Sequence, residues 1–219
     1  ANVALGEYGE TIVLDWGLAK LAGHPDVHAS RWQAQITEFR TTTDMATMTS
    51  ALGTPGYMAP EAAAGDVEHV DQLADVYSLG AMLFEIIAGR LPFEFRNFHE
   101  YASQVIAQEA PTATSFDEDV PESLSSLCAS ALALDRTRRP KAVAALAKGV
   151  RTWQRSRAED REVDVLLDEA KGALADAEGL SVLAMGRQSE RATAACQRIL
   201  DLRSGHPVAR KLMKDARAL

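Results

Sequence analysis

The chain has 219 residues, of which 47% are hydrophobic and 25% are charged, and these values are typical of a folded globular protein. Its net charge of -8 is uneven, because residues 1–150 carry 10 Lys and Arg against 20 Asp and Glu, whereas residues 151–219 carry 13 against 11. An acidic main region argues against nucleic-acid binding. No uninterrupted apolar run reaches about 18 residues, so we expect no membrane span in this segment.

The two cysteines, Cys128 and Cys196, lie at apolar positions of expected helices and show no metal-binding spacing. This pattern predicts buried free thiols in a reducing compartment, and hence a cytoplasmic location.

A β-hairpin is expected near the start of the chain. The β-prone runs 3–5 and 11–14 flank the glycine-containing turn 6–10. The hairpin brings Asp15 to its end, followed by Trp16 and Gly17. A carboxylate held in this way can coordinate Mg²⁺, although Asp-x-Gly is also a common turn.

A long connection follows at residues 19–52, and its part from 41 to 50 carries six Ser or Thr side chains. Such long connections are usually functional or disordered. It leads into the string Gly-Thr-Pro-Gly-Tyr-Met-Ala-Pro-Glu at residues 53–61. This string is too specific to be explained as a simple turn.

The next element is a helix capped by Asp71 and ended by Gly89. Apolar residues occupy nearly all of its faces, which predicts the central helix of a core. These residues are Val76, Tyr77, Leu79, Ala81, Met82, Leu83, Phe84, Ile86 and Ile87.

Further amphipathic helices are expected at residues 98–106 and 124–132, and from Lys141 to Trp153. The Arg-rich turn at 134–140 separates the last two, and we interpret Arg136 and Arg138 as solvated. A charged stretch follows at 154–162, and then helices at 163–174, at 187–202 and from Val208 onward.

Taken together, these motifs resemble a bacterial-type Ser/Thr protein kinase. Asp15-Trp16-Gly17 stands where the family has Asp-Phe-Gly, and Trp16 keeps a large apolar ring. Residues 53–61 resemble the end of the activation segment, which closes on Ala-Pro-Glu. The string 75–80 resembles the family's central helix, and Arg139-Pro140 its Arg-Pro signature.

The resemblance implies an ATP site with Mg²⁺ or Mn²⁺, in which Asp15 and Asn2 are the metal ligands and catalytic residues. It also implies that four residues seat the protein substrate: Thr54, Pro55, Gly56 and Tyr57. The presence of Thr54 favours Ser/Thr over Tyr as the phosphate acceptor.

Other residues receive supporting roles from the resemblance. Gly17 fixes Asp15, Asp75 accepts hydrogen bonds from the catalytic loop, and Glu61 pairs with Arg139. Thr47 and Thr49 are the phosphorylation candidates, because a phosphate there can order the segment. For each threonine, an ordinary polar surface loop is an equally good interpretation.

The implied fold is mainly α: a kinase-like C-terminal lobe, made of a β-hairpin and a helical bundle, over residues 1–153. Residues 154–219 are expected to form a charged linker and a helical-hairpin tail. The family's catalytic Asp, Gly-rich loop and ATP-positioning Lys would precede residue 1. We therefore expect a fragment that is inactive by itself.

Two alternatives stay open at this point. The parent protein is either a kinase acting on protein substrates in bacterial signalling, or an inactive kinase-like scaffold with a partner-binding tail. The turn at 204–207 resembles a tetratricopeptide-type junction, and a generic helical hairpin explains it equally well.

Overall fold

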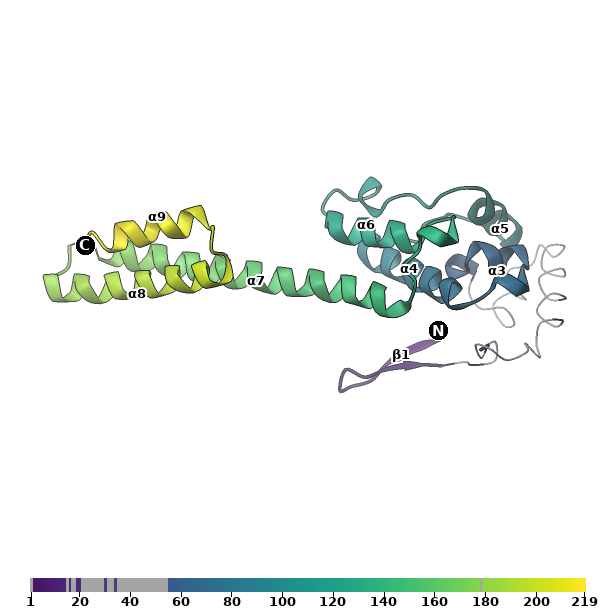
Figure 1. Cartoon of the computed structure of the whole chain (residues 1–219), viewed down its shortest axis with the longest axis horizontal. Helices are drawn as coiled ribbons and strands as arrows, with labels where there is room; N and C mark the ends of the chain where they lie inside the picture. The colour runs from purple at the N-terminus through teal and green to yellow at the C-terminus, as the bar shows by residue number, and fades with distance from the viewer. Residues whose placement is uncertain are drawn as a thin grey trace. The chain divides into compact units, whose positions relative to one another are not determined.

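The structure, a computed structural model, describes residues 2–14, 16, 19–20, 30, 34, 55–177 and 179–219. The chain divides into two compact units, Ala1–Val150 and Arg151–Leu219. Figure 1 colours the first from purple to green and the second from green to yellow. None of the helices within the described residues has the length and apolar character needed to cross a membrane.

The expected hairpin is present. Strands β1 (Val3–Leu5) and β2 (Thr11–Val13) pair antiparallel, with Val3 opposite Val13. The pairing continues by one residue, because the N–H of Leu14 donates to the carbonyl of Asn2 at 2.8 Å. The hairpin thus places Asn2 beside the residue that immediately precedes Asp15.

Helix α4 (Gln72–Ala88) is the centre of the first unit. It has the predicted ends: Asp71 accepts a hydrogen bond from the N–H of Leu73 at 2.8 Å, and Gly89 ends the helix with a φ of 69°. Glycine adopts this left-handed conformation without steric cost. The capping residues therefore predicted the bounds of this helix correctly.

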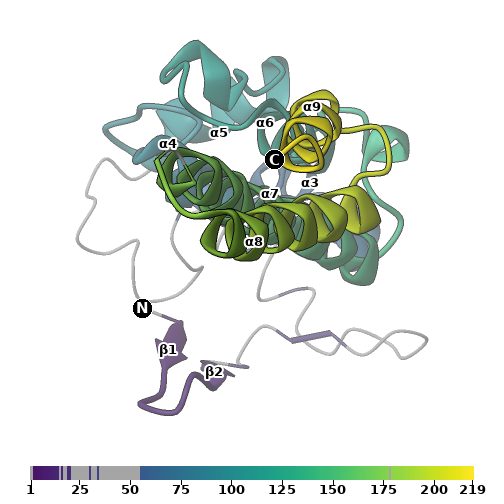
Figure 2. The same cartoon turned by 90° about the vertical axis from the view of Figure 1, so that its left-hand side faces the viewer.

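The remaining helical elements of this unit surround α4, and Figures 1 and 2 show α3, α5 and α6 gathered with it. They are η1 (Pro55–Tyr57), α3 (Pro60–Ala64), η2 (Val67–His69), α5 (Phe98–Ala107), η3 (Ala113–Ser115), α6 (Glu122–Ala131) and η4 (Arg136–Arg138). Tyr77 and Phe84 of α4 share one core with Phe98 and Tyr101 of α5. A close approach joins α4 to α6, since a Cβ on Gly80 would lie only 2.6 Å from that of Ala131.

One apolar residue of α4 departs from the expectation of burial. Ile86 is 77% exposed in the described structure, whereas Val76, Tyr77 and Phe84 are fully buried. The apolar residues of α4 therefore occupy a wider part of the helix surface than the neighbouring described elements cover.

The second unit consists of the C-terminal part of α7 (Val143–Asp176) with α8 (Val182–Leu202) and α9 (Pro207–Ala216). The predicted separation into a helix, a charged linker at 154–162 and a new helix is wrong, because α7 is continuous through that stretch. The stretch contains no Gly or Pro, and its Arg, Glu, Gln and Ala residues favour helix formation. Helix α8 also begins five residues before the expected start.

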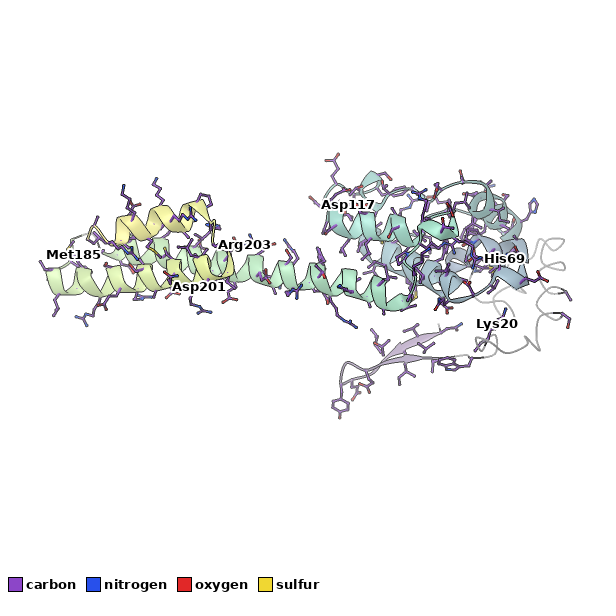
Figure 3. All side chains as sticks on the ribbon, viewed as in Figure 1. Lys20, His69, Asp117, Met185, Asp201 and Arg203 are labelled. Carbon is purple, nitrogen blue, oxygen red and sulfur yellow. The ribbon has the colours of Figure 1, made fainter. Side chains whose placement is uncertain are left out.

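The core of this unit is formed by apolar side chains from all three helices. These are Val163, Leu166, Ala170, Ala195, Cys196, Ile199, Ala209 and Met213. Two ion pairs join α7 to the C-terminal part of α8. Glu162 of α7 contacts Arg198 of α8 at 2.6 Å, and Asp160 of α7 contacts Arg203, the residue that follows α8 and is labelled in Figure 3. The tetratricopeptide-type assignment of this tail stays a prediction.

Both cysteines are buried and free, as the sequence predicts. Burial raises the pKa of the Cys128 thiol to about 12 and also raises that of Cys196. Both thiols therefore act as small apolar core groups.

Candidate active site

One of the two expected metal ligands, Asn2, lies at the open end of the hairpin. Asn2 is exposed, and its carbonyl accepts the hydrogen bond from Leu14 described above. Asp15 and Gly17 lie outside the described residues. The set of one carboxylate and one amide oxygen fits Mg²⁺, which prefers oxygen ligands. Among the residues that the structure describes, no cluster of three or more His, Cys, Asp or Glu side chains could hold a metal.

The expected substrate-binding segment is held against the helices. Thr54 lies outside the described residues, whereas Pro55 and Gly56 are buried in η1. The Tyr57 hydroxyl donates to Glu85 of α4 at 2.5 Å. One residue later, the carbonyl of Met58 accepts a hydrogen bond at 2.5 Å from the buried hydroxyl of Tyr101 in α5. Two tyrosines thus anchor this short segment to two different helices.

Burial, the hydrogen bond to Glu85 and the charge of that carboxylate, in this order of size, together raise the pKa of Tyr57 to about 12. Ionised Tyr57 would be repelled by Glu85 and would lose its role as donor. The contact between η1 and α4 therefore depends on a protonated phenol.

This pKa shift predicts the stability of the protein at alkaline pH. Unfolded Tyr57, with an ordinary pKa of 10.0, releases its proton before folded Tyr57 does, so its contribution is full below pH 10.0 and is lost as the pH rises towards about 12. We expect Tyr57→Phe to show a smaller loss of unfolding free energy across this window than the wild type. Urea unfolding at several pH values measures the difference.

Tyr8→Phe is the control for this experiment, because Tyr8 is 94% exposed. It should follow the wild-type curve. A Tyr57→Phe curve parallel to the wild type would contradict the proposed dependence.

The expected pair of Glu61 and Arg139 is present and buried. Arg139 donates to Glu61 through Nη1 at 2.7 Å and Nη2 at 3.0 Å, although the residues are 78 positions apart. The side chain of Arg139 is 0% exposed and that of Glu61 is 5% exposed. Two parallel hydrogen bonds between planar ions are a geometry that Lys cannot reproduce.

Arg139 also satisfies its other donors inside the protein. Its Nε donates to the carbonyl of Ala133 at 2.9 Å, and Nη1 donates to that of Leu73 at 3.1 Å. The guanidinium carbon lies 4.9 Å from the ring centroid of Tyr77. One side chain therefore joins α3, α4 and the segment after α6.

Asp75 lies in the first turn of α4 and is exposed as a residue. Partial burial of its carboxyl group raises its pKa, and the negative charge of Asp71 adds to the shift. Hydrogen bonds from other described residues do not reach this carboxylate. The Asp75 carboxylate therefore lies on the surface of α4 and can accept further hydrogen bonds.

The interpretation of Arg136 as a solvated residue is wrong, whereas that of Arg138 is consistent with its 64% exposed side chain. The Arg136 side chain is only 25% exposed and forms ion pairs with Glu61 and Asp71. The spacing of Arg136 and Arg139 could have indicated this, because residues three apart align on one side of a 3₁₀ turn such as η4. Thr47 and Thr49, the phosphorylation candidates, lie outside the described residues.

Removing Arg139 should strongly destabilise the first unit. Arg139→Ala leaves the buried Glu61 with only the longer contact to Arg136 at 3.4 Å, and the loss of the main partner of a buried charge costs about 3 to 5 kcal/mol. Arg138→Ala removes only the exposed pair with Glu109 and should change stability by less than about 0.5 kcal/mol. Urea unfolding, followed by hydrogen exchange of the α4 amides, measures both. Equal effects of the two variants would rule out a special role for the buried pair.

The sequence of the chain is similar to those of known protein kinases. A family model described as "Protein kinase domain" matches residues 1–150. The chain is 30% identical, over 163 residues, to the serine/threonine-protein kinase PknD of Protochlamydia amoebophila; the match covers 72% of this chain and 16% of that protein. It is 31% identical, over 138 residues, to the probable serine/threonine-protein kinase PknB of Bifidobacterium longum, covering 63% of this chain and 17% of the relative.

A third relative is the serine/threonine-protein kinase PrkC of Bacillus subtilis, which is 31% identical over 106 residues, or 46% of this chain and 16% of the relative. The chain belongs to the protein kinase domain family, and the three relatives named here are described as bacterial Ser/Thr kinases. It spans only about a sixth of the length of these relatives.

Proposed function

We propose that this chain is the C-terminal part of the catalytic domain of a Ser/Thr protein kinase, which transfers the γ-phosphoryl group of ATP to Ser or Thr hydroxyls of proteins. The observation that carries the proposal is the buried pair of Glu61 and Arg139. It fixes the end of the motif at residues 53–61 to the helical core, which is what a kinase requires of its activation segment.

In this proposal, Asp15 and Asn2 hold Mg²⁺ or Mn²⁺. The metal bound to ATP neutralises negative charge that develops on the phosphate oxygens. Asn2 contributes an amide oxygen at the end of the hairpin, and Gly17 allows the turn that fixes Asp15.

The substrate-binding role belongs to Thr54, Pro55, Gly56 and Tyr57. Support comes from the contacts of this segment, since Tyr57 is anchored on Glu85 and the adjoining Met58 carbonyl on Tyr101. A segment held at both points can present a peptide hydroxyl in a constant position, which lowers the entropic cost of the reaction. Asp75 serves as the acceptor that holds the catalytic loop.

The second unit is proposed as a protein-binding tail. Its helices form a core of their own. Phosphorylation at Thr47 or Thr49 is proposed to act on the first unit. The bacterial kinase relatives support a role in signalling, and we propose a cytoplasmic location.

The test is phosphoryl transfer by the protein expressed from the whole reading frame that encodes this chain. With labelled ATP, Mg²⁺ and a general protein substrate, Asp15→Ala should lower kcat at least about 100-fold, because it removes a metal ligand. Its thermal unfolding should stay close to that of the wild type. Glu118→Ala, a change at an exposed acidic residue, is the matched control and should keep full activity.

An active Asp15→Ala variant would remove Asp15 from the site. A wild-type protein that binds ATP but transfers no phosphate would favour the inactive scaffold over the kinase.

A further inference from the structure

A second arginine lies against the buried pair. The Nη2 of Arg136 lies 2.7 Å from Oδ1 of Asp71, and its Nε lies 3.4 Å from Oε1 of Glu61. Both nitrogens are buried and have no hydrogen-bond partner among the described residues, so these two contacts are ion pairs. Their charge is therefore compensated by these two carboxylates.

The four side chains form a neutral group of two cations and two anions. Glu61 Oε1 is shared by Arg139 at 2.7 Å and Arg136 at 3.4 Å. Asp71 has no such contact with Arg139 and depends on Arg136 for its ion pair. Arg136 is thus the residue that connects the Glu61 end of the group to Asp71.

Asp71 is also the N-terminal cap of α4. The same oxygen that contacts Arg136 accepts the hydrogen bond from Leu73 N–H. The carbonyl of Leu73 accepts a hydrogen bond from Arg139. The first turn of α4 is consequently held at two points, by Arg136 of η4 and by Arg139, which follows η4. The first turn of α4 also contains Asp75.

We propose that Arg136 is a positioning residue that fixes the first turn of α4, and with it Asp75, against Glu61 at the start of α3. The structural part stands on these contacts alone. Its consequence for catalysis rests on the proposed function, because Asp75 would hold the catalytic loop. Measurements on the chain without ATP test the structural role of Arg136 separately from its consequence for catalysis.

The first readout is the carboxyl titration of Asp71, followed by NMR. Burial alone would raise the pKa of Asp71, but the Leu73 N–H and the Arg136 guanidinium outweigh it, with a smaller contribution from Arg139, and hold that pKa below its usual range. Asp75 also lies nearby, and its own pKa is raised by burial and by the negative charge of Asp71. Arg136→Gln should therefore raise the Asp71 pKa, whereas Arg136→Lys should largely restore it.

The second readout is hydrogen exchange. In Arg136→Gln, amides of α3 and of the first turn of α4 should exchange roughly ten-fold faster, because Asp71 has lost its ion-pair partner and Glu61 has lost one of its two. Amides in the middle of α6 should keep their wild-type rates. Arg138→Gln, a change of the exposed neighbour that pairs with Glu109, is the control and should alter neither region.

Two results would overturn the proposal. One is an Asp71 pKa that stays the same in Arg136→Gln. The other is exchange that accelerates equally in α3, α4 and α6, because this would show a general loss of stability and no specific positioning role.

Discussion

The fold of the first unit depends on one buried ionic contact. Moving a guanidinium and a carboxylate out of water is costly, and their attraction compensates only if both ions keep good hydrogen bonds. Arg139 meets this requirement with two bonds to Glu61 and one each to the carbonyls of Ala133 and Leu73. The contact can therefore form only when α3, the start of α4 and the segment after α6 are all in place. This makes it a constraint on the arrangement and not merely a source of stability.

The position of the proposed substrate-binding segment follows from this constraint. Arg139 fixes Glu61, which is the last residue of the motif. The hydrogen bonds of Tyr57 and Met58 fix the residues just before it. Both tyrosine contacts use neutral donors, since burial raises the pKa of Tyr57 and of Tyr101. A rigid helical core thus holds a short segment from three directions, in the way that catalytic domains hold a loop that must meet a second molecule.

Features set by local chemistry could be predicted from the sequence. The hairpin and the ends of α4 follow from turn and capping residues, and the contact between Glu61 and Arg139 from the family resemblance. Features set by tertiary packing could not. The exposure of Ile86 depends on which elements cover α4, and the ion pairs of Arg136 depend on the chain bringing Asp71 beside η4. The continuity of α7 was missed because charge was taken as the sign of a linker, although Arg, Glu and Gln favour helices as well. The roles of Asp15, Thr54, Thr47 and Thr49 stay predictions.

A double-mutant cycle on Glu61 and Arg139 tests the central claim most directly. Glu61→Leu and Arg139→Met should each cost about 3 to 5 kcal/mol of unfolding free energy, because each leaves a buried charge with a weaker partner or none. The double variant, which removes both charges and keeps most of the volume, should cost no more than either single change. Costs that simply add in the double variant would contradict the account, because they would show that the two side chains stabilise the fold independently.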